Sequence, residues 1–312
     1  MRIDPQVDFA CKMMLGSPEH PSVTIHFLNS LLSLQVPVVE VEILNPIVGK
    51  ERAEEKMIVL DVLARDGLGR LFNIEMQTRL LMAFSNRLLF YNCKNYARQL
   101  RTGVEYAELC PAISICILDR RLFPEAPQVP NQTWHHSFRL RCDQDKTLVL
   151  SNDFEFHIFE LPKFHASAEQ VKHLPPAQKW LYLFKYGAVT DLETLSGILT
   201  EEPFQEALGV LEMITKTPED YQYYEDRLKS IRDEKWLLNS ARREGEKLGE
   251  ERGEERGEKR GLELGLLVGK IQALQAALLD PVSPEAELLA RPQADLKATL
   301  AELQSRLQSR RD

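Results

Sequence analysis

Hydrophobic and polar positions in the first half of the chain alternate between helical and strand patterns. Residues 6–34 carry apolar side chains at helical spacing, with a break at Gly16-Ser17-Pro18. A second helical pattern covers 79–102. Strand patterns, alternating or continuously apolar, occur over 38–46, 57–64, 71–77, 112–119, 133–142 and 147–160. Helices and strands in this order predict an α/β domain.

The strand patterns stop after Leu161-Pro162-Lys163, and the rest of the chain has helical periodicity. We therefore expect an α/β domain over 1–165, a helical extension over 166–235 and an all-helical end over 236–312. Only the last of these segments contains a regular series of glycines.

Strands 57–64 and 71–77 form a predicted hairpin that carries the candidate chemistry. Alternate residues of a strand point to opposite sides, so Glu75 and Gln77 share one face, a polar one. The opposite face, with Phe72, Ile74 and Met76, is apolar and suits a core.

The length of the hairpin loop decides where Asp61 points. A two-residue loop pairs Asp61 with Ile74 and turns it away from Glu75, whereas a three-residue loop, Gly67-Leu68-Gly69, pairs Asp61 with Glu75. Such a loop needs a residue with positive φ at its third position, and Gly69 stands there. We favour this register, which brings the two Cβ atoms to roughly 5 Å.

Two facing carboxylates repel each other unless a cation lies between them. Mg²⁺ takes oxygen ligands and often only one or two protein carboxylates, leaving positions for water and phosphate. Asp61 and Glu75 are therefore candidate Mg²⁺ ligands for phosphodiester hydrolysis. The plainer interpretation is a polar outer strand face on which two acids meet by chance.

The helix expected over 79–102 carries a basic stripe. Arg87, Lys94, Arg98 and Arg101 are spaced 7, 4 and 3 residues apart, which places them on one helix face. Such a stripe, directly after the hairpin, could bind a phosphate backbone without reading bases. The alternative is an ordinary solvated helix face.

Composition narrows the class of protein. The chain of 312 residues is 44% hydrophobic and 28% charged, which suits a globular protein with a core. No apolar run approaches the ~20 residues that span a bilayer, and no secretory leader is recognisable. The net charge of −8 argues mildly against nucleic-acid binding, although a local basic surface matters more.

The cysteines and histidines point to no structural metal site. The five cysteines are odd in number and contain no CxxC pair, so we expect reduced thiols and a cytoplasmic protein. The seven histidines form no HExxH or HxH spacing. The pair His135-His136 is expected to be exposed.

Several strings together resemble the recombination-promoting nuclease / putative transposase family. The most specific is Asn73-Ile74-Glu75-Met76-Gln77 at its distance from Leu60-Asp61-Val62, and the likeness extends over about residues 4–240. The other strings are Asp8-Phe9-Ala10-Cys11-Lys12, Phe27-Leu28-Asn29-Ser30-Leu31-Leu32, Arg87, Tyr91, Tyr96, Gln99-Leu100, Gly103, Tyr106, Ile113 to Leu118, and Glu160-Leu161-Pro162-Lys163-Phe164.

That family is placed in the PD-(D/E)XK nuclease superfamily, which implies a restriction-endonuclease-like mixed sheet flanked by helices within residues 1–165. The resemblance also implies Mg²⁺-dependent DNA cleavage and a link to RecA-independent recombination.

Carried over by position, Asp61 and Glu75 are the acidic metal ligands, and Asp8 is a possible additional acid. Gln77 stands where the superfamily usually has lysine. A neutral amide can orient the attacking water by hydrogen bonds but cannot deprotonate it, which puts the rate in doubt. Lys56 could supply charge if the sheet curls.

Glycine recurs at every fourth position from Gly245 to Gly269, within a block of alternating acidic and basic residues. Each glycine costs a helix about 1 kcal/mol relative to alanine, and ion pairs four residues apart recover only about 0.2–0.5 kcal/mol each. The segment is either a flexible charged tether or a helix whose glycine stripe permits close self-association. Apolar residues from Leu262 to Leu279 favour a homo-oligomer through these C-terminal helices.

The sequence thus favours a Mg²⁺-dependent DNA endonuclease of recombination or mobile elements. The rival is a catalytically weak or inactive protein that binds DNA and self-associates. An RNA substrate stays open.

Overall fold

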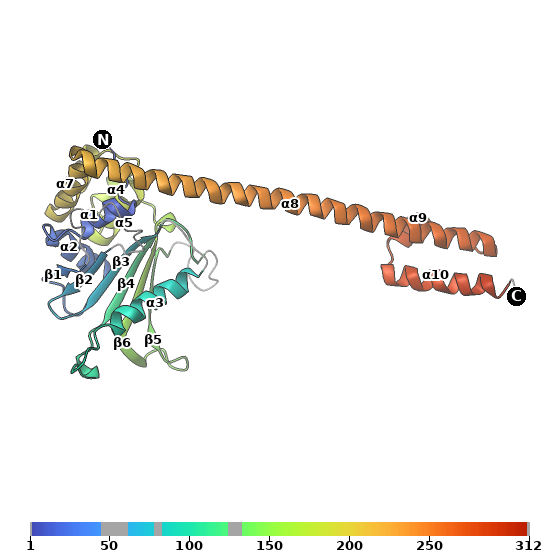
Figure 1. Ribbon diagram of the computed structural model, residues 1–312, viewed down its shortest axis with the longest axis horizontal. Helices are drawn as coiled ribbons and strands as arrows, with labels where there is room; N and C mark the ends of the chain where they lie inside the picture. Colours follow the sequence, from blue (N-terminus) through green and yellow to red (C-terminus); the bar gives the residue numbers. More distant parts are fainter. Residues whose placement is uncertain (1, 45–61, 78–82, 124–132, 311–312) are drawn as a thin grey trace. The chain divides into compact units, whose positions relative to one another are not determined.

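Figure 1 shows the computed structural model, which describes residues 2–44, 62–77, 83–123 and 133–310. The chain forms two compact units, Met1–Ile231 and Arg232–Asp312. Within the described residues, no helix combines the length and the apolarity that crossing a membrane requires.

The first unit is built on a mixed six-stranded sheet in the order β1-β2-β3-β4-β6-β5. β3, β4 and β6 run parallel, while the pairs β1–β2, β2–β3 and β5–β6 are antiparallel. The strands are β1 (Val41–Ile43), β2 (Val62–Asp66), β3 (Leu71–Gln77), β4 (Ala112–Leu118), β5 (His135–Arg141) and β6 (Val149–Glu160).

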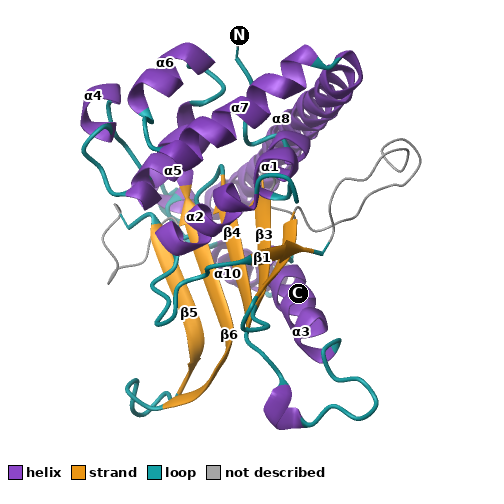
Figure 2. Cartoon of the chain, turned by 90° about the vertical axis from the view of Figure 1, so that its left-hand side faces the viewer, coloured by secondary structure: helices purple, strands orange, loops and turns teal. Residues whose placement is uncertain are grey.

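Helices cover one face of this sheet and form the main core with it (Figure 2). The side chains of Phe72, Ile74 and Ile115 enter this core from the sheet, and Phe27 and Trp180 enter it from the helices. The helices of this layer are α1 (Asp8–Leu15), α2 (Pro21–Leu31), α4 (Ala168–Val171), α5 (Pro176–Tyr186), α6 (Leu192–Ile198) and α7 (Glu202–Lys216).

The opposite face of the sheet is covered by α3 (Phe84–Ala97). Phe84 and Leu88 of α3 form a small second core with Cys116, Phe156 and Ile158. Two short 3₁₀ helices complete the unit: η2 (Tyr106–Glu108) lies between α3 and β4, and η3 (Leu161–Lys163) follows β6. The residues of β3 that face α3 are therefore set between a sheet and a helix.

α8 (Pro218–Leu278) begins in the first unit, where Tyr224 and Ile231 belong to the main core. The second unit contains the rest of α8 together with α9 (Glu285–Leu289) and α10 (Gln293–Gln308). Its own core is small and consists of Val268, Ile271, Leu278, Leu288, Leu296 and Leu303.

This architecture confirms the expected fold class, a mixed sheet flanked by helices and followed by a helical region. The break at Gly16-Ser17-Pro18 separates α1 from α2, as expected. The long helix expected over 79–102 is wrong at its end, because α3 stops at Ala97 and the chain turns through Gly103, whose φ is +90°. The division of the chain at residues 165 and 235 stays a prediction.

Candidate active site

The β2–β3 hairpin has the register that the sequence favours. Val62 pairs with Ile74, and Arg65 pairs with Leu71. Gly69 closes the three-residue loop with a φ of +79°, in the left-handed region that favours glycine. One further pair in this register would join Asp61 to Glu75. Asp61 and Lys56 lie outside the described residues, so the position of the Asp61 carboxylate stays a prediction.

Glu75 lies on the face of β3 that α3 covers, and it is only 6% exposed. The surface expected to be a polar outer face is therefore a buried one. Burial raises the pKa of the Glu75 carboxyl, because a low-polarity environment disfavours its charged form. Two neighbours act the other way on this pKa: the Asn73 side chain donates a hydrogen bond to Oε1 at 3.1 Å, and Arg87 contributes positive charge.

A layer of buried amides lies between the sheet and α3, on the same face of the sheet as Glu75. Asn73 and Asn92 are 2% and 1% exposed. The Nδ2 of Asn92 donates to Ser114 Oγ at 2.8 Å and to the Ala112 carbonyl at 3.1 Å, which fastens α3 to β4. Within the described residues, Asn73 Oδ1 and Asn92 Oδ1 have no hydrogen-bond donor. Buried oxygens without a donor are uncommon and call for an explanation.

These groups suit a hard cation. The layer offers a carboxylate whose charged form is destabilised by burial, together with an amide oxygen that lacks a donor, and a divalent ion would relieve both. Glu75 and Asn73 alone do not complete a site, since the described part of the chain contains no group of three His, Cys, Asp or Glu residues placed to hold a metal. The second carboxylate that the sequence predicts, that of Asp61, belongs to a residue outside the described ones. The structure describes Gln77 as the last residue of β3.

The basic residues of α3 lie on the flank of the helix that faces the hairpin. At about 100° per residue, Arg87, Lys94 and Arg98 fall on one side, and Tyr96 falls on the other. The hydroxyl of Tyr96 donates to Asp153 of β6 at 3.0 Å, so the basic flank is turned towards β3 and β2. The expectation that Arg101 belongs to the same helix is wrong, because Arg98 already forms the C-cap.

Asp8 begins α1, and its carboxylate is held in an ion pair with Arg227 of α8, with Arg227 Nε donating to Oδ1 at 3.0 Å. α1 belongs to the core on the face of the sheet opposite Glu75. The structure therefore does not bring Asp8 together with Glu75, and a role for this acid stays a prediction.

Lys12, also on α1, is a residue that the sequence reasoning did not single out. It is buried, at 6% exposure. A Cβ added at Gly16 would lie 3.4 Å from Lys12 Cγ and 3.2 Å from Val62 Cγ2, so the lysine adjoins the residue that follows Asp61 in the chain. The burial of Lys12 is what distinguishes it from other lysines, and this burial is visible only in the structure.

The string Glu160-Leu161-Pro162-Lys163-Phe164 has a structural role. Glu160 is fully buried and accepts hydrogen bonds from the backbone N–H groups of Leu122 and Phe123 at 2.6 and 3.2 Å. Lys163 Nζ donates to Glu160 at 2.5 Å, and His136 Nε2 lies 2.9 Å from it. These contacts hold the segment that leaves β4, and they lower the pKa of Glu160 against the effect of burial.

The expected exposure of His135-His136 is wrong, because both rings are partly buried. His135 stacks on Phe159, with ring centroids 4.2 Å apart, and its Nε2 lies 2.9 Å from Nδ1 of His157. The other nitrogen of His157 bonds Glu155, which Arg139 also contacts. Burial lowers the pKa of His135 to about 4. These groups lie on the face of the sheet opposite Glu75.

Comparison with known families agrees with this geometry. A family model described as "PD-(D/E)XK nuclease family transposase" matches residues 5–241, about three quarters of the chain. The match spans the whole sheet and both layers of helices described above. No curated protein and no solved structure matches the chain.

Proposed function

Since the chain belongs to the PD-(D/E)XK nuclease family transposases, we propose that it is a Mg²⁺-dependent endonuclease that hydrolyses DNA in recombination or mobile-element movement. The observation that carries this proposal is the hairpin register. Continued by one pair beyond Val62 and Ile74, this register would place Asp61 opposite Glu75 on the face that α3 covers. Carboxylates that meet in this way are suited to share one divalent ion.

When bound, Mg²⁺ lowers the pKa of a coordinated water and neutralises charge that develops on the phosphate. Asp61 and Glu75 would hold the ion. Asn73 orients Glu75 through its hydrogen bond to Oε1, and its Oδ1 offers a further oxygen on the same side. This amide keeps the carboxylate ready for the ion in spite of its burial.

The remaining side chains position the substrate and supply positive charge. Gln77 orients the attacking water by hydrogen bonding. Arg87, whose charge already acts on Glu75, is placed to contact the phosphate that is cleaved.

We also propose the setting in which the enzyme acts. All five cysteines are free, which supports reducing conditions and a cytoplasmic location. One site cuts one strand, so a homo-oligomer formed through the C-terminal helices would provide the two sites that a double-strand cut requires.

A specific observation also favours the rival function, a DNA-binding protein with little or no activity. Glu75 is buried and its pKa is raised, so burial acts against the charged carboxylate that a metal ion requires. The two functions differ in what they do with labelled duplex DNA in the presence of Mg²⁺ or Mn²⁺. The enzyme yields products that EDTA abolishes, whereas the rival retards the same DNA and leaves it intact with every divalent ion. Labelled RNA of the same sequence decides between the two substrate classes.

A further inference from the structure

A second feature on the α3 side of the hairpin is a pocket at its loop end. The pocket has a volume of about 450 Å³ and lies between the hairpin and the end of α3. Its walls include Arg65 and Gly69 of the hairpin, Arg98 at the C-cap of α3, Arg101 in the segment that follows α3, and Cys110 ahead of β4. We call it the hairpin pocket.

Three arginines, Arg65, Arg98 and Arg101, line the hairpin pocket, against one acidic residue, Glu108. Arg65 has a loose partner, since Glu42 lies 3.6 Å away and both side chains are about half exposed or more. No ion pair engages Arg98 or Arg101 in the part of the chain that the structure describes. An exposed ion pair contributes little, so an anion in the pocket competes with it easily. Guanidinium groups suit phosphate because their planar fork donates two parallel hydrogen bonds.

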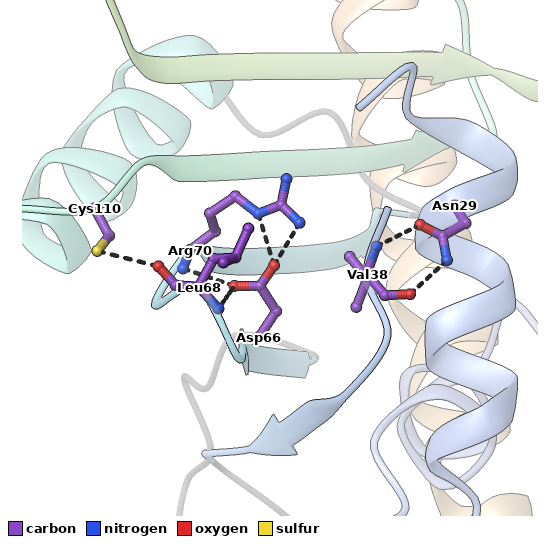
Figure 3. A network of polar contacts seen from close by, with 6 residues as sticks. All are labelled: Asn29, Val38, Asp66, Leu68, Arg70 and Cys110. Atoms are coloured by element: carbon purple, nitrogen blue, oxygen red, sulfur yellow. Dashed lines mark hydrogen bonds and ion pairs between the residues drawn. The ribbon is translucent and has the colours of Figure 1, made fainter. Parts of the chain in front are cut away.

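Both walls of the hairpin pocket are fixed by hydrogen bonds. In the hairpin loop, Asp66 Oδ1 accepts from the backbone N–H groups of Leu68 and Arg70 at 3.1 and 2.9 Å (Figure 3). Across the pocket, Gln99 exchanges two hydrogen bonds with the Cys110 backbone at 2.8 and 3.0 Å. Figure 3 also shows Cys110 Sγ reaching the Leu68 carbonyl, at 3.4 Å, which ties the two walls together. A pocket ordered in this way pays less entropy on binding.

The position of the hairpin pocket relative to Glu75 identifies its ligand. Leu71, which lines the pocket, and Glu75 point to the same face of β3 and are four residues apart, about 13 Å in a strand. The pocket is therefore too far from Glu75 to hold the phosphate that is cleaved.

We propose that the hairpin pocket binds a backbone phosphate of the nucleic acid about 13 Å away from the bond that Glu75 helps to cleave. This inference rests on the proposed function, because it takes nucleic acid as the substrate. The basic flank of α3 connects the two places, since Arg87 acts on Glu75 at one end and Arg98 lines the pocket at the other. The pocket is an anchor that holds the backbone in line with the active site and reads no base.

The test measures binding to a short labelled duplex by fluorescence anisotropy, in EDTA, over a range of salt concentrations. Arg65→Gln and Arg98→Gln should each weaken binding about three- to tenfold and reduce the slope of log K against log salt by about 0.9, the loss of one phosphate contact. The double variant should lose no more slope than either single one, because both residues act on the same phosphate. Arg98→Lys should keep the wild-type slope.

Arg291→Gln, in the second unit, is the matched control and should leave the slope unchanged. A wild-type slope in the Arg65 and Arg98 variants, or an equal loss in the control, overturns the proposal. A pocket that binds free anions and not DNA would also overturn the proposal. Inorganic phosphate would then raise the melting temperature of wild type and not of Arg65→Gln, while the slope of log K for DNA binding against log salt would be the same in both proteins. Because no divalent ion is present, these outcomes are independent of whether the protein cleaves DNA.

Discussion

At the scale of single residues, the hydrogen bond from Asn73 to Glu75 makes a prediction about pH. This bond favours the ionised carboxyl and opposes the effect of burial on its pKa. Without it, the pKa of Glu75 rises further, and a higher pH is needed before the carboxylate can bind metal. Asn73→Ala should lower cleavage about 10- to 100-fold at neutral pH and move the acid limb of the pH–rate profile to higher pH.

Asn92→Ala is the control for that prediction, since Asn92 is equally buried and bonds Ala112 and Ser114 instead of Glu75. It should lower the melting temperature and leave the position of the acid limb unchanged. An Asn73→Ala profile that is merely scaled down, with its acid limb in the wild-type position, would show that Asn73 only supports the fold.

At the scale of elements, the pairing of β5 with β6 should make the first unit sensitive to acid. His135 is neutral in the folded protein because its pKa is lowered to about 4, mainly by burial and by His157 and His136. The unfolded chain takes up a proton below about pH 6.5, so stability falls as pH decreases from there to about 4. Glu155 acts in the opposite direction, because its negative charge raises the pKa of His135. The pKa of Glu155 is itself lowered, so its contribution to stability is lost only at a pH below the range in which His135 acts.

Urea unfolding followed by tryptophan fluorescence at several pH values tests this expectation. His135→Phe keeps the stack on Phe159 and removes the titrating group, so its urea midpoint should change less between pH 6.5 and 4 than that of wild type. His165→Phe, at an exposed position, should retain the wild-type dependence. Equal dependence in the His135 variant and wild type would assign the acid sensitivity to other groups.

The elements differ in how far the sequence predicts them. The hairpin follows from two local signals, the alternation of apolar and polar residues in β3 and the glycine that its loop requires. These signals predicted the register of the hairpin, and they placed Glu75 on the face of β3 opposite Phe72, Ile74 and Met76. The amide layer and the hairpin pocket depend on where α3 docks, and the spacing of apolar residues along α3 does not determine that. The partly buried His135 was missed because its burial comes from β6, a strand that follows it in the chain.

At the scale of the whole molecule, the glycines of α8 decide between a tether and an association surface. The segment is helical, and a Cβ added at any glycine from Gly245 to Gly269 would meet nothing within 4 Å in this chain. In a free helix, Gly253→Ala should raise helicity and stabilise the helix by about 1 kcal/mol, with no change in mass. At a close contact between two copies, the added methyl group should instead lower the mass towards that of a monomer.

Light scattering after size exclusion measures this directly, and the proposed homo-oligomer predicts the second outcome, with a larger effect for Gly253→Leu. Glu254 lies next to Gly253 in the chain but outside the glycine stripe, so Glu254→Ala should leave the mass of the particle in solution as in wild type. A wild-type protein that already runs as a monomer at micromolar concentration would contradict self-association.

The whole account depends on Asp61 and Glu75 acting as one metal site. The most direct measurement is the cleavage of supercoiled plasmid with and without Mg²⁺ by wild type, Asp61→Ala and Glu75→Gln, with Asp153→Asn as a carboxylate control on another strand. We predict cleavage by wild type and the control only when Mg²⁺ is present, and none by the other two variants. Cleavage that survives both substitutions, or a wild type that binds the plasmid and never cuts it with Mg²⁺, would contradict the account.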